Sequence, residues 1–117
     1  MSSKSLELPL VENKNEVMTI TDRIRQAISP RKIYLFGSFA RGDVRKHSDY
    51  DFYVVMPDGE GSMLEFCQEA YSSLVGMKRQ RGADILVSDE STFAKRLHGQ
   101  TIEAEVEQEG ILLYEHS

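Results

Sequence analysis

The sequence contains one cysteine, no tryptophan, three prolines and no long apolar run. Because Cys67 stands alone, the chain forms no internal disulfide, and Cys and His ligands for a zinc site are too few. No apolar stretch approaches the roughly 18 residues that span a bilayer. The first residues also lack the apolar segment of a secretory signal. We therefore expect a cytoplasmic protein that does not associate with a membrane.

Basic residues are also fewer than acidic residues. The chain has 14 Lys and Arg against 19 Asp and Glu, a net charge of −5. Proteins that coat nucleic acid usually present a basic face, so this balance argues against direct nucleic-acid binding. With 117 residues, of which 40% are hydrophobic, the chain suits one domain around one core.

The hydropathy pattern separates a short arm from this domain. Residues 1–15 are mostly polar, show no period, and are interpreted as a loosely ordered N-terminal arm. Residues 16–117 are predicted to form the single domain. From Val17 the apolar residues recur at helical spacing, and the helix is expected to be capped by Thr19 or Thr21 and to end at Pro30.

Four apolar runs predict strands, at residues 32–36, 50–56, 83–88 and 111–114. Between them, Ser62 and Glu65 form a capping box that begins a helix, and Gly76 suits its C′ position. Helical residues are predicted within 90–109, with an interruption at Gly99, and the glutamates of that segment are interpreted as a solvated face. This alternation of helices and strands along the chain predicts an α/β (α+β) domain with a mixed β-sheet of four or five strands flanked by helices.

The pair Gly37-Ser38 lies where the strand at 32–36 ends and a helix is expected to begin. Free amides and the positive end of a helix favour an anion there. Gly37 would let a phosphate approach the backbone, and the Ser38 hydroxyl can donate to it. A simple chain turn is the alternative interpretation. Arg41, one helical turn further on, can reach a phosphate or form a surface ion pair.

Asp49 and Asp51 are two residues apart at the start of a predicted strand, so their carboxylates share one face. Two like charges held this close repel each other unless a cation lies between them, and Mg²⁺ prefers carboxylate oxygens. Asp84 begins another strand and is preferred as a third ligand over Asp43 and Asp89, because apolar strand residues follow it. Solvated strand ends are the alternative. Three converging carboxylates can hold two Mg²⁺ ions about 3.5–4 Å apart.

The spacing Gly37-Ser38, ten residues, then Asp49-Tyr50-Asp51 resembles the signature of the DNA-polymerase-β-like nucleotidyltransferase superfamily. Residues 34–55 are similar to its minimal members, the MNT proteins, and residues 83–87 resemble the strand that carries the third carboxylate. The phosphate-binding lysine motif of P-loop proteins and the GxGxxG of dinucleotide-binding folds are absent.

This resemblance implies a reaction and a role for each residue. Gly37 and Ser38 would hold the β- and γ-phosphates of ATP. Asp49 and Asp51 would bind both Mg²⁺ ions, and Asp84 would complete the catalytic metal site and help activate an acceptor hydroxyl. That hydroxyl would attack the α-phosphorus, and pyrophosphate would leave.

The MNT resemblance also implies a partner. These proteins pair with HEPN-domain toxins as antitoxins, and some transfer AMP from ATP onto a tyrosine of the toxin. The short chain is expected to lack an acceptor-binding domain of its own, which agrees with a protein acceptor. Two alternatives remain: a non-catalytic antitoxin that neutralises its partner by stoichiometric binding, and a nucleotidyltransferase acting on a small molecule such as an aminoglycoside.

Overall fold

A computed structural model describes residues 12–116. Its centre is a four-stranded sheet in the order β3-β2-β1-β4. Strand β1 (Lys32–Phe36) runs antiparallel to β2 (Tyr50–Met56) on one side and to β4 (Ile111–Glu115) on the other. Strand β3 (Ala83–Asp89) lies at the edge and runs parallel to β2. The sheet is therefore mixed, and its one parallel pair is β2–β3.

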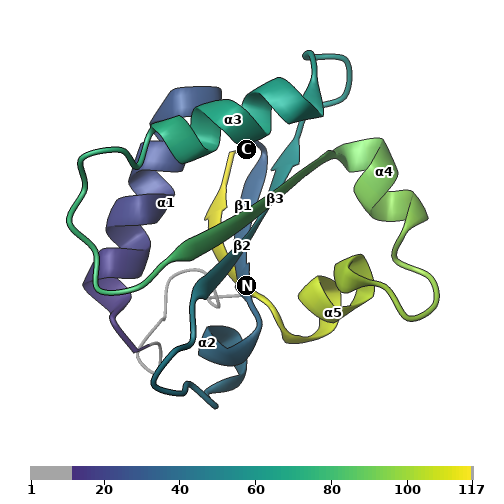
Figure 1. The fold of residues 1–117 in the computed structure, drawn as a ribbon. Coiled ribbons are helices and arrows are strands. Elements are labelled where there is room, and N and C mark those ends of the chain that lie inside the picture. Colours follow the sequence, from purple (N-terminus) through teal and green to yellow (C-terminus); the bar gives the residue numbers. More distant parts are fainter. Residues whose placement is uncertain (1–11, 117) are drawn as a thin grey trace.

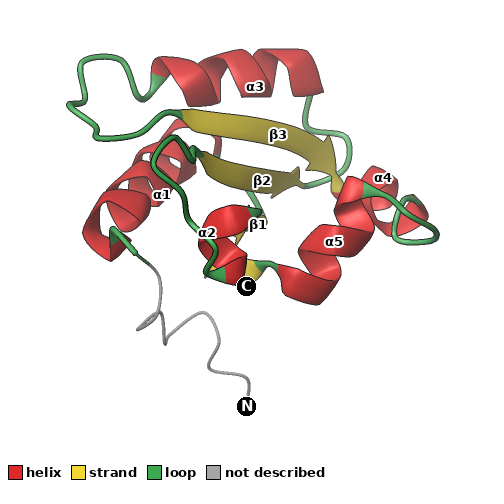
Figure 2. Ribbon diagram, turned by 60° about the horizontal axis from the view of Figure 1, so that its bottom comes forward, coloured by secondary structure: helices red, strands yellow, loops and turns green. Residues whose placement is uncertain are grey.

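Helices cover both faces of this sheet (Figure 1). Helices α1 (Lys14–Ile28) and α3 (Met63–Ser72) lie on one face, and α4 (Glu90–Lys95) and α5 (Ile102–Glu109) lie on the other. Figure 2 shows the short helix α2 (Ser38–Arg41) beyond the end of β1. Within residues 12–116, no helix combines the length and apolarity that a membrane span requires.

Each face of the sheet has its own buried cluster, because successive strand residues point to opposite sides. Ile33 and Leu35 pack toward α1 and α3, together with the buried stripe Val17, Ile20 and Ile24 of α1. The other cluster is rich in aromatic rings that face α4 and α5. It consists of Tyr34, Phe36, Tyr53, Val55, Phe93 and Val106. The acidic side chains of the candidate site, described below, lie on the α4/α5 face.

The structure confirms the predicted fold class and most of the predicted elements. Strands β1 and β2 have the predicted bounds, and β3 and β4 each extend one residue further. The amide of Glu65 donates to the Ser62 hydroxyl oxygen at 3.3 Å, which is the predicted N-cap of α3. Gly99 separates α4 from α5, as expected.

The start of α1 was predicted wrongly. The helix begins at Lys14, so the last residues of the predicted arm are helical, and residues 1–11 lie outside the described part of the chain. Asn13 occupies the N-cap position, whereas the Thr19 and Thr21 hydroxyls donate to carbonyl groups four residues earlier. The residues of this first turn, Lys14, Asn15 and Glu16, are polar, so hydrophobic spacing alone does not reveal them.

The end of α3 also differs from the prediction. The helix stops at Ser72 with Ser73 as its C-cap, and two further turns lead to Gly76. Gly76 has a φ of 84°, so it does take the left-handed conformation, but three residues beyond the C-cap. The prediction recognised the need for glycine correctly and misplaced the helix end.

Candidate active site

The parallel pairing of β2 with β3 sets Asp51 in register with Asp84. Side chains in register on adjacent strands project to the same face of a sheet. Tyr53, two residues after Asp51, lies in the aromatic cluster, whereas Phe52 lies in the α1/α3 cluster. Asp51 and Asp84 therefore share the α4/α5 face. Asp51 is partly buried and Asp84 is exposed.

Asp49 lies just before β2 and is exposed. Its carboxylate passes close to Gly82, where an added Cβ would lie 3.1 Å from the Asp49 Oδ1 atom. The Tyr50 amide donates to the Gly82 carbonyl at 2.9 Å, so the two chain segments are held together. Asp49 thus lies at the same end of the β2–β3 pair as the other two aspartates.

The three carboxylates are close enough to affect one another. The pKa of Asp51 is raised to about 6, first by burial and then by the negative charges of Asp84, Asp49 and Glu105. The guanidinium of Arg41 acts in the opposite direction. The ionised form of Asp51 is therefore destabilised when no metal is bound, and a bound cation would stabilise it.

Carboxylate oxygens are the ligand type that Mg²⁺ prefers, so the chemistry of the donor set fits this ion. Among residues 12–116, no three Asp, Glu, His or Cys side chains are grouped closely enough to enclose a metal. Asp49 and Asp84 are exposed, and exposed side chains move freely between staggered rotamers. Both side chains are therefore free to reorient when an ion binds.

Gly37 brings the start of α2 against the carboxylate of Asp51. Its φ of 74° and ψ of −153° belong to a region that is open to glycine alone. A Cβ added at Gly37 would overlap the Oδ2 atom of Asp51. The amides of Ala40 and Arg41 donate to the Gly37 carbonyl at 3.1 and 3.0 Å, which begins α2 directly beside the aspartate. The predicted strand-to-helix turn is therefore present.

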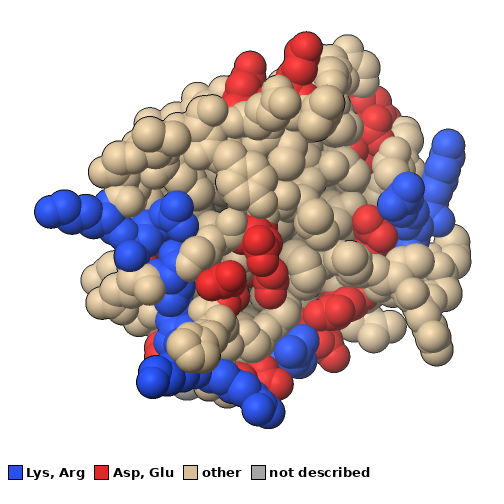
Figure 3. Space-filling view, in the orientation of Figure 1, with Lys and Arg blue, Asp and Glu red and all other residues tan. Residues whose placement is uncertain are grey.

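A cavity of about 610 Å³ joins these features. Five of the six predicted site residues line it, namely Gly37, Ser38, Arg41, Asp51 and Asp84. Asp49 is the one that does not. In Figure 3 acidic atoms gather near the middle of this face, below β3 and above α2 in the view of Figure 1, and a band of Lys and Arg borders them at the lower left.

Arg41 forms ion pairs in this structure. Its guanidinium lies 3.3 Å from Asp43, 3.2 Å from Glu105 and 3.9 Å from Glu109. Of the two roles expected for Arg41, a phosphate contact or a surface ion pair, the structure shows the surface ion pair. Pairs between exposed side chains contribute about 0–1 kcal/mol, so a phosphate in the cavity can compete for the same guanidinium.

Sequence reasoning missed two glutamates of α5. The four glutamates of this segment were interpreted as a solvated face, yet Glu103 is 7% exposed and Glu105 lines the cavity. The prediction failed because α5 is short and its first turn packs against the sheet, which buries a residue that the sequence pattern suggests is exposed. No spacing in the sequence distinguishes Glu103 from the exposed Glu107.

A polymerase beta nucleotidyltransferase family model matches residues 18–117. The chain belongs to this nucleotidyltransferase family. The match includes every predicted site residue. A search of curated proteins finds no match.

Solved structures similar to this nucleotidyltransferase share its fold. A candidate nucleotidyltransferase from Sulfolobus solfataricus is 17% identical, with 98% of this chain and 90% of that chain covered and a TM-score of 0.61. A toxin-antitoxin with AMP-PNP is 23% identical, with 89% and 74% covered and a TM-score of 0.54. A mutant of the toxin-antitoxin MntA-HpeT is 22% identical, with 89% and 74% covered and a TM-score of 0.53.

The contact between Gly37 and Asp51 predicts unequal effects of two alanine substitutions. Gly37→Ala and Gly42→Ala both place a Cβ at positive φ, but only the first meets the Asp51 carboxylate, since nothing lies within 4 Å at Gly42. We expect Gly42→Ala to cost about 1–2 kcal/mol of unfolding free energy and Gly37→Ala roughly 2 kcal/mol more. Urea unfolding measures both, and equal losses would contradict the packing described.

The raised pKa of Asp51 predicts a pH-dependent stabilisation by Asp51→Asn. Because the folded-state pKa lies above the unfolded value, ionisation lowers wild-type stability as pH rises from about 4 through 6. In EDTA, we expect Asp51→Asn to match wild type below pH 4 and to be about 1 kcal/mol more stable at pH 7, after allowance for solvent screening. Thermal unfolding across this range measures the difference, and a pH-independent gap would refute the electrostatic account.

Proposed function

We propose that this nucleotidyltransferase transfers AMP from ATP onto a tyrosine hydroxyl of a HEPN-domain toxin, and so acts as the antitoxin of a toxin–antitoxin pair. The observation that carries the proposal is the register of Asp51 with Asp84 beside the Gly37-Ser38 turn, in one cavity. Two similar structures are toxin–antitoxin proteins, one of them with AMP-PNP, which supports a toxin partner and an adenine nucleotide.

In this proposal the residues of the chain have separate tasks. Asp49, Asp51 and Asp84 would hold two Mg²⁺ ions, which when bound neutralise charge on the triphosphate and favour ionisation of the acceptor hydroxyl. The amides at the start of α2 and the Ser38 hydroxyl orient the β- and γ-phosphates. Arg41 exchanges its surface ion pairs for a phosphate oxygen.

The reaction exchanges one phosphoester bond for another. The acceptor oxygen forms a bond to the α-phosphorus, the bond from that phosphorus to the bridging oxygen breaks, and pyrophosphate leaves. Asp84 accepts a hydrogen bond from the acceptor hydroxyl and orients it for attack, and the released proton passes to solvent. Catalysis of this kind depends mainly on positioning and charge neutralisation.

A protein acceptor is favoured by the position of Asp84. Strand β3 is an edge strand, so Asp84 is approachable from outside the sheet. Three exposed apolar side chains, Tyr71, Leu86 and Ile102, line the same cavity and are 42%, 39% and 47% exposed. Exposed apolar groups around a polar centre are typical of a surface that a ligand or another protein covers.

Incubation with α-labelled ATP, Mg²⁺ and a HEPN-domain toxin, to be sought in the adjacent reading frame, tests the proposal. We expect label on the partner, and at least a hundredfold slower labelling with Asp49→Asn or Asp51→Asn, because each removes a metal ligand. Asp22→Asn, an exposed substitution on α1, serves as the matched control and should label at the wild-type rate.

Two outcomes would replace the proposal. If the aspartate variants suppress the partner's toxicity without labelling it, the chain is an antitoxin that acts by stoichiometric binding. If the isolated chain instead adenylylates an aminoglycoside, the acceptor is a small molecule.

A further inference from the structure

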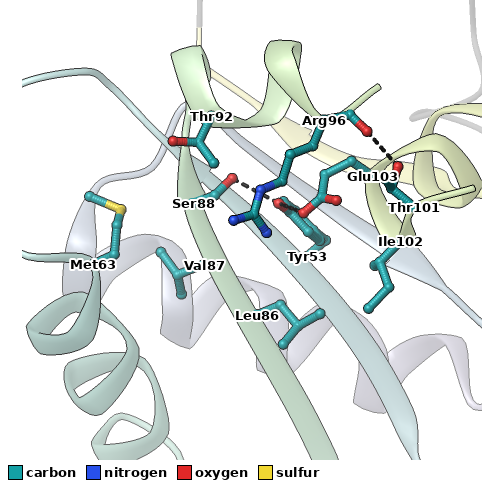
Figure 4. Close-up of a pocket in the computed structure, with 10 residues that line it drawn as sticks. All are labelled: Tyr53, Met63, Leu86, Val87, Ser88, Thr92, Arg96, Thr101, Ile102 and Glu103. Atoms are coloured by element: carbon teal, nitrogen blue, oxygen red, sulfur yellow. Dashed lines mark hydrogen bonds between the residues drawn. The ribbon is translucent and has the colours of Figure 1, made fainter. Parts of the chain in front are cut away.

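A second cavity of about 620 Å³ adjoins the candidate active site. It lies at the far half of β3, where it is lined by residues of β3, α4 and α5 and, across the edge of the strand, by Met63 of α3 (Figure 4). Leu86 and Ile102 line both cavities. The two spaces are therefore neighbours along β3, separated by a pair of exposed apolar side chains.

The second cavity contains a buried carboxylate, that of Glu103, which is 7% exposed. One of its oxygens, Oε2, accepts a hydrogen bond from the Tyr53 hydroxyl at 2.6 Å. The Tyr53 hydroxyl also lies 2.8 Å from the Ser88 hydroxyl. Burial raises the pKa of Tyr53, so Tyr53 stays protonated and can donate to Glu103.

Within residues 12–116 the carboxylate accepts this hydrogen bond through Oε2. Its other oxygen, Oε1, is not among the fully buried unpaired atoms of these residues, so it is accessible to a ligand in the cavity. In Figure 4 the Glu103 carboxylate lies among the residues that line the cavity, and the Arg96 side chain extends across the same space. The cavity is therefore lined by a hydrogen-bond acceptor, the Glu103 carboxylate, and by the guanidinium of Arg96.

The distance between the two sites follows from the strand geometry. Asp84, Leu86 and Ser88 are alternate residues of β3, so they face the same side. At about 3.3 Å per residue, Leu86 lies roughly 7 Å and Ser88 roughly 13 Å beyond Asp84. In a nucleotide, the ribose connects the α-phosphate to the base, and it spans about the interval from Asp84 to Leu86.

We propose that the second cavity binds the nucleobase of the donor nucleotide, and that Glu103 selects adenine by accepting a hydrogen bond from its 6-amino group. This inference rests on the proposed function and adds base recognition to it. Leu86 and Ile102 contact the base or ribose as apolar walls, and Arg96 stacks on the base plane. Guanine presents a carbonyl oxygen where adenine has the amine, and that oxygen is repelled by the carboxylate.

An acceptor tyrosine suits this cavity less well. Its hydroxyl must reach the α-phosphorus beside Asp51 and Asp84. A tyrosine ring in the second cavity would direct its hydroxyl to Glu103, away from both aspartates. The base of the nucleotide has no such constraint, because it takes no part in bond formation.

Calorimetric titration of the full chain in Mg²⁺ with ATP and with purine riboside triphosphate, which lacks the 6-amino group, tests the inference. Since a hydrogen bond to a charged group is involved, we expect wild type to bind ATP about tenfold more tightly. In Glu103→Met the preference should fall below twofold, while Tyr53 keeps Ser88 as a partner. Glu107→Met, an exposed change on the same helix, should retain the tenfold preference.

The possible failures are distinguishable. If wild type binds both triphosphates equally in the presence of Mg²⁺, base selection by Glu103 is wrong and the proposed function stands. If Glu103→Met lowers the Tm but keeps the tenfold preference, Glu103 only attaches α5 to the sheet, and the inference is likewise overturned. If wild type binds neither triphosphate, the proposed function fails together with the inference. If Glu103→Met does not fold, equal binding of the two triphosphates by wild type still overturns the inference.

Discussion

Electrostatic repulsion between in-register carboxylates is the constraint around which this structure is arranged. The parallel pairing of β2 and β3 places Asp51 beside Asp84, and the start of α2 adds a glycine backbone against the same carboxylate. Burial first, and then the negative charges of Asp84 and Asp49, raise the pKa of Asp51, so the local charge distribution is unfavourable. A fold selected for stability alone would not retain it. Clusters of this kind are typical of functional sites, where a ligand supplies the missing opposite charge.

The sheet topology leaves the candidate site open at one edge. Because β3 is an edge strand, Asp84 has the sheet on one side only. The edge of β3 is partly protected, since the Ile85 amide donates to the Tyr71 hydroxyl of α3 at 2.8 Å. Along the same face, α4 and α5 cover the far half of the strand and enclose the second cavity. One sheet face therefore presents a charged end and a more apolar end, which matches the two ends of a nucleotide.

Most of the fold could be predicted from the sequence, because the signals are local, and five of the six residues predicted for the site line one cavity. Apolar runs predicted the strands, Ser62 predicted a helix start, and the spacing of Asp49 and Asp51 predicted a shared face. What failed depends on tertiary packing. The burial of Glu103 arises from how α5 packs on the sheet. The surface ion pair of Arg41 was one of the roles considered for it, but its partner Glu105, 64 positions away, could not be named from the sequence. The start of α1 was missed because its first turn is polar and has no hydrophobic period.

The most direct test of the central claim is a crystal structure of the chain with Mn²⁺ and AMP-PNP, with the metal located by its anomalous scattering. The account predicts manganese bound by the carboxylates of Asp49, Asp51 and Asp84, with the β- and γ-phosphates at Gly37 and Ser38. Manganese bound elsewhere, or a triphosphate that lies away from the start of α2, would contradict it.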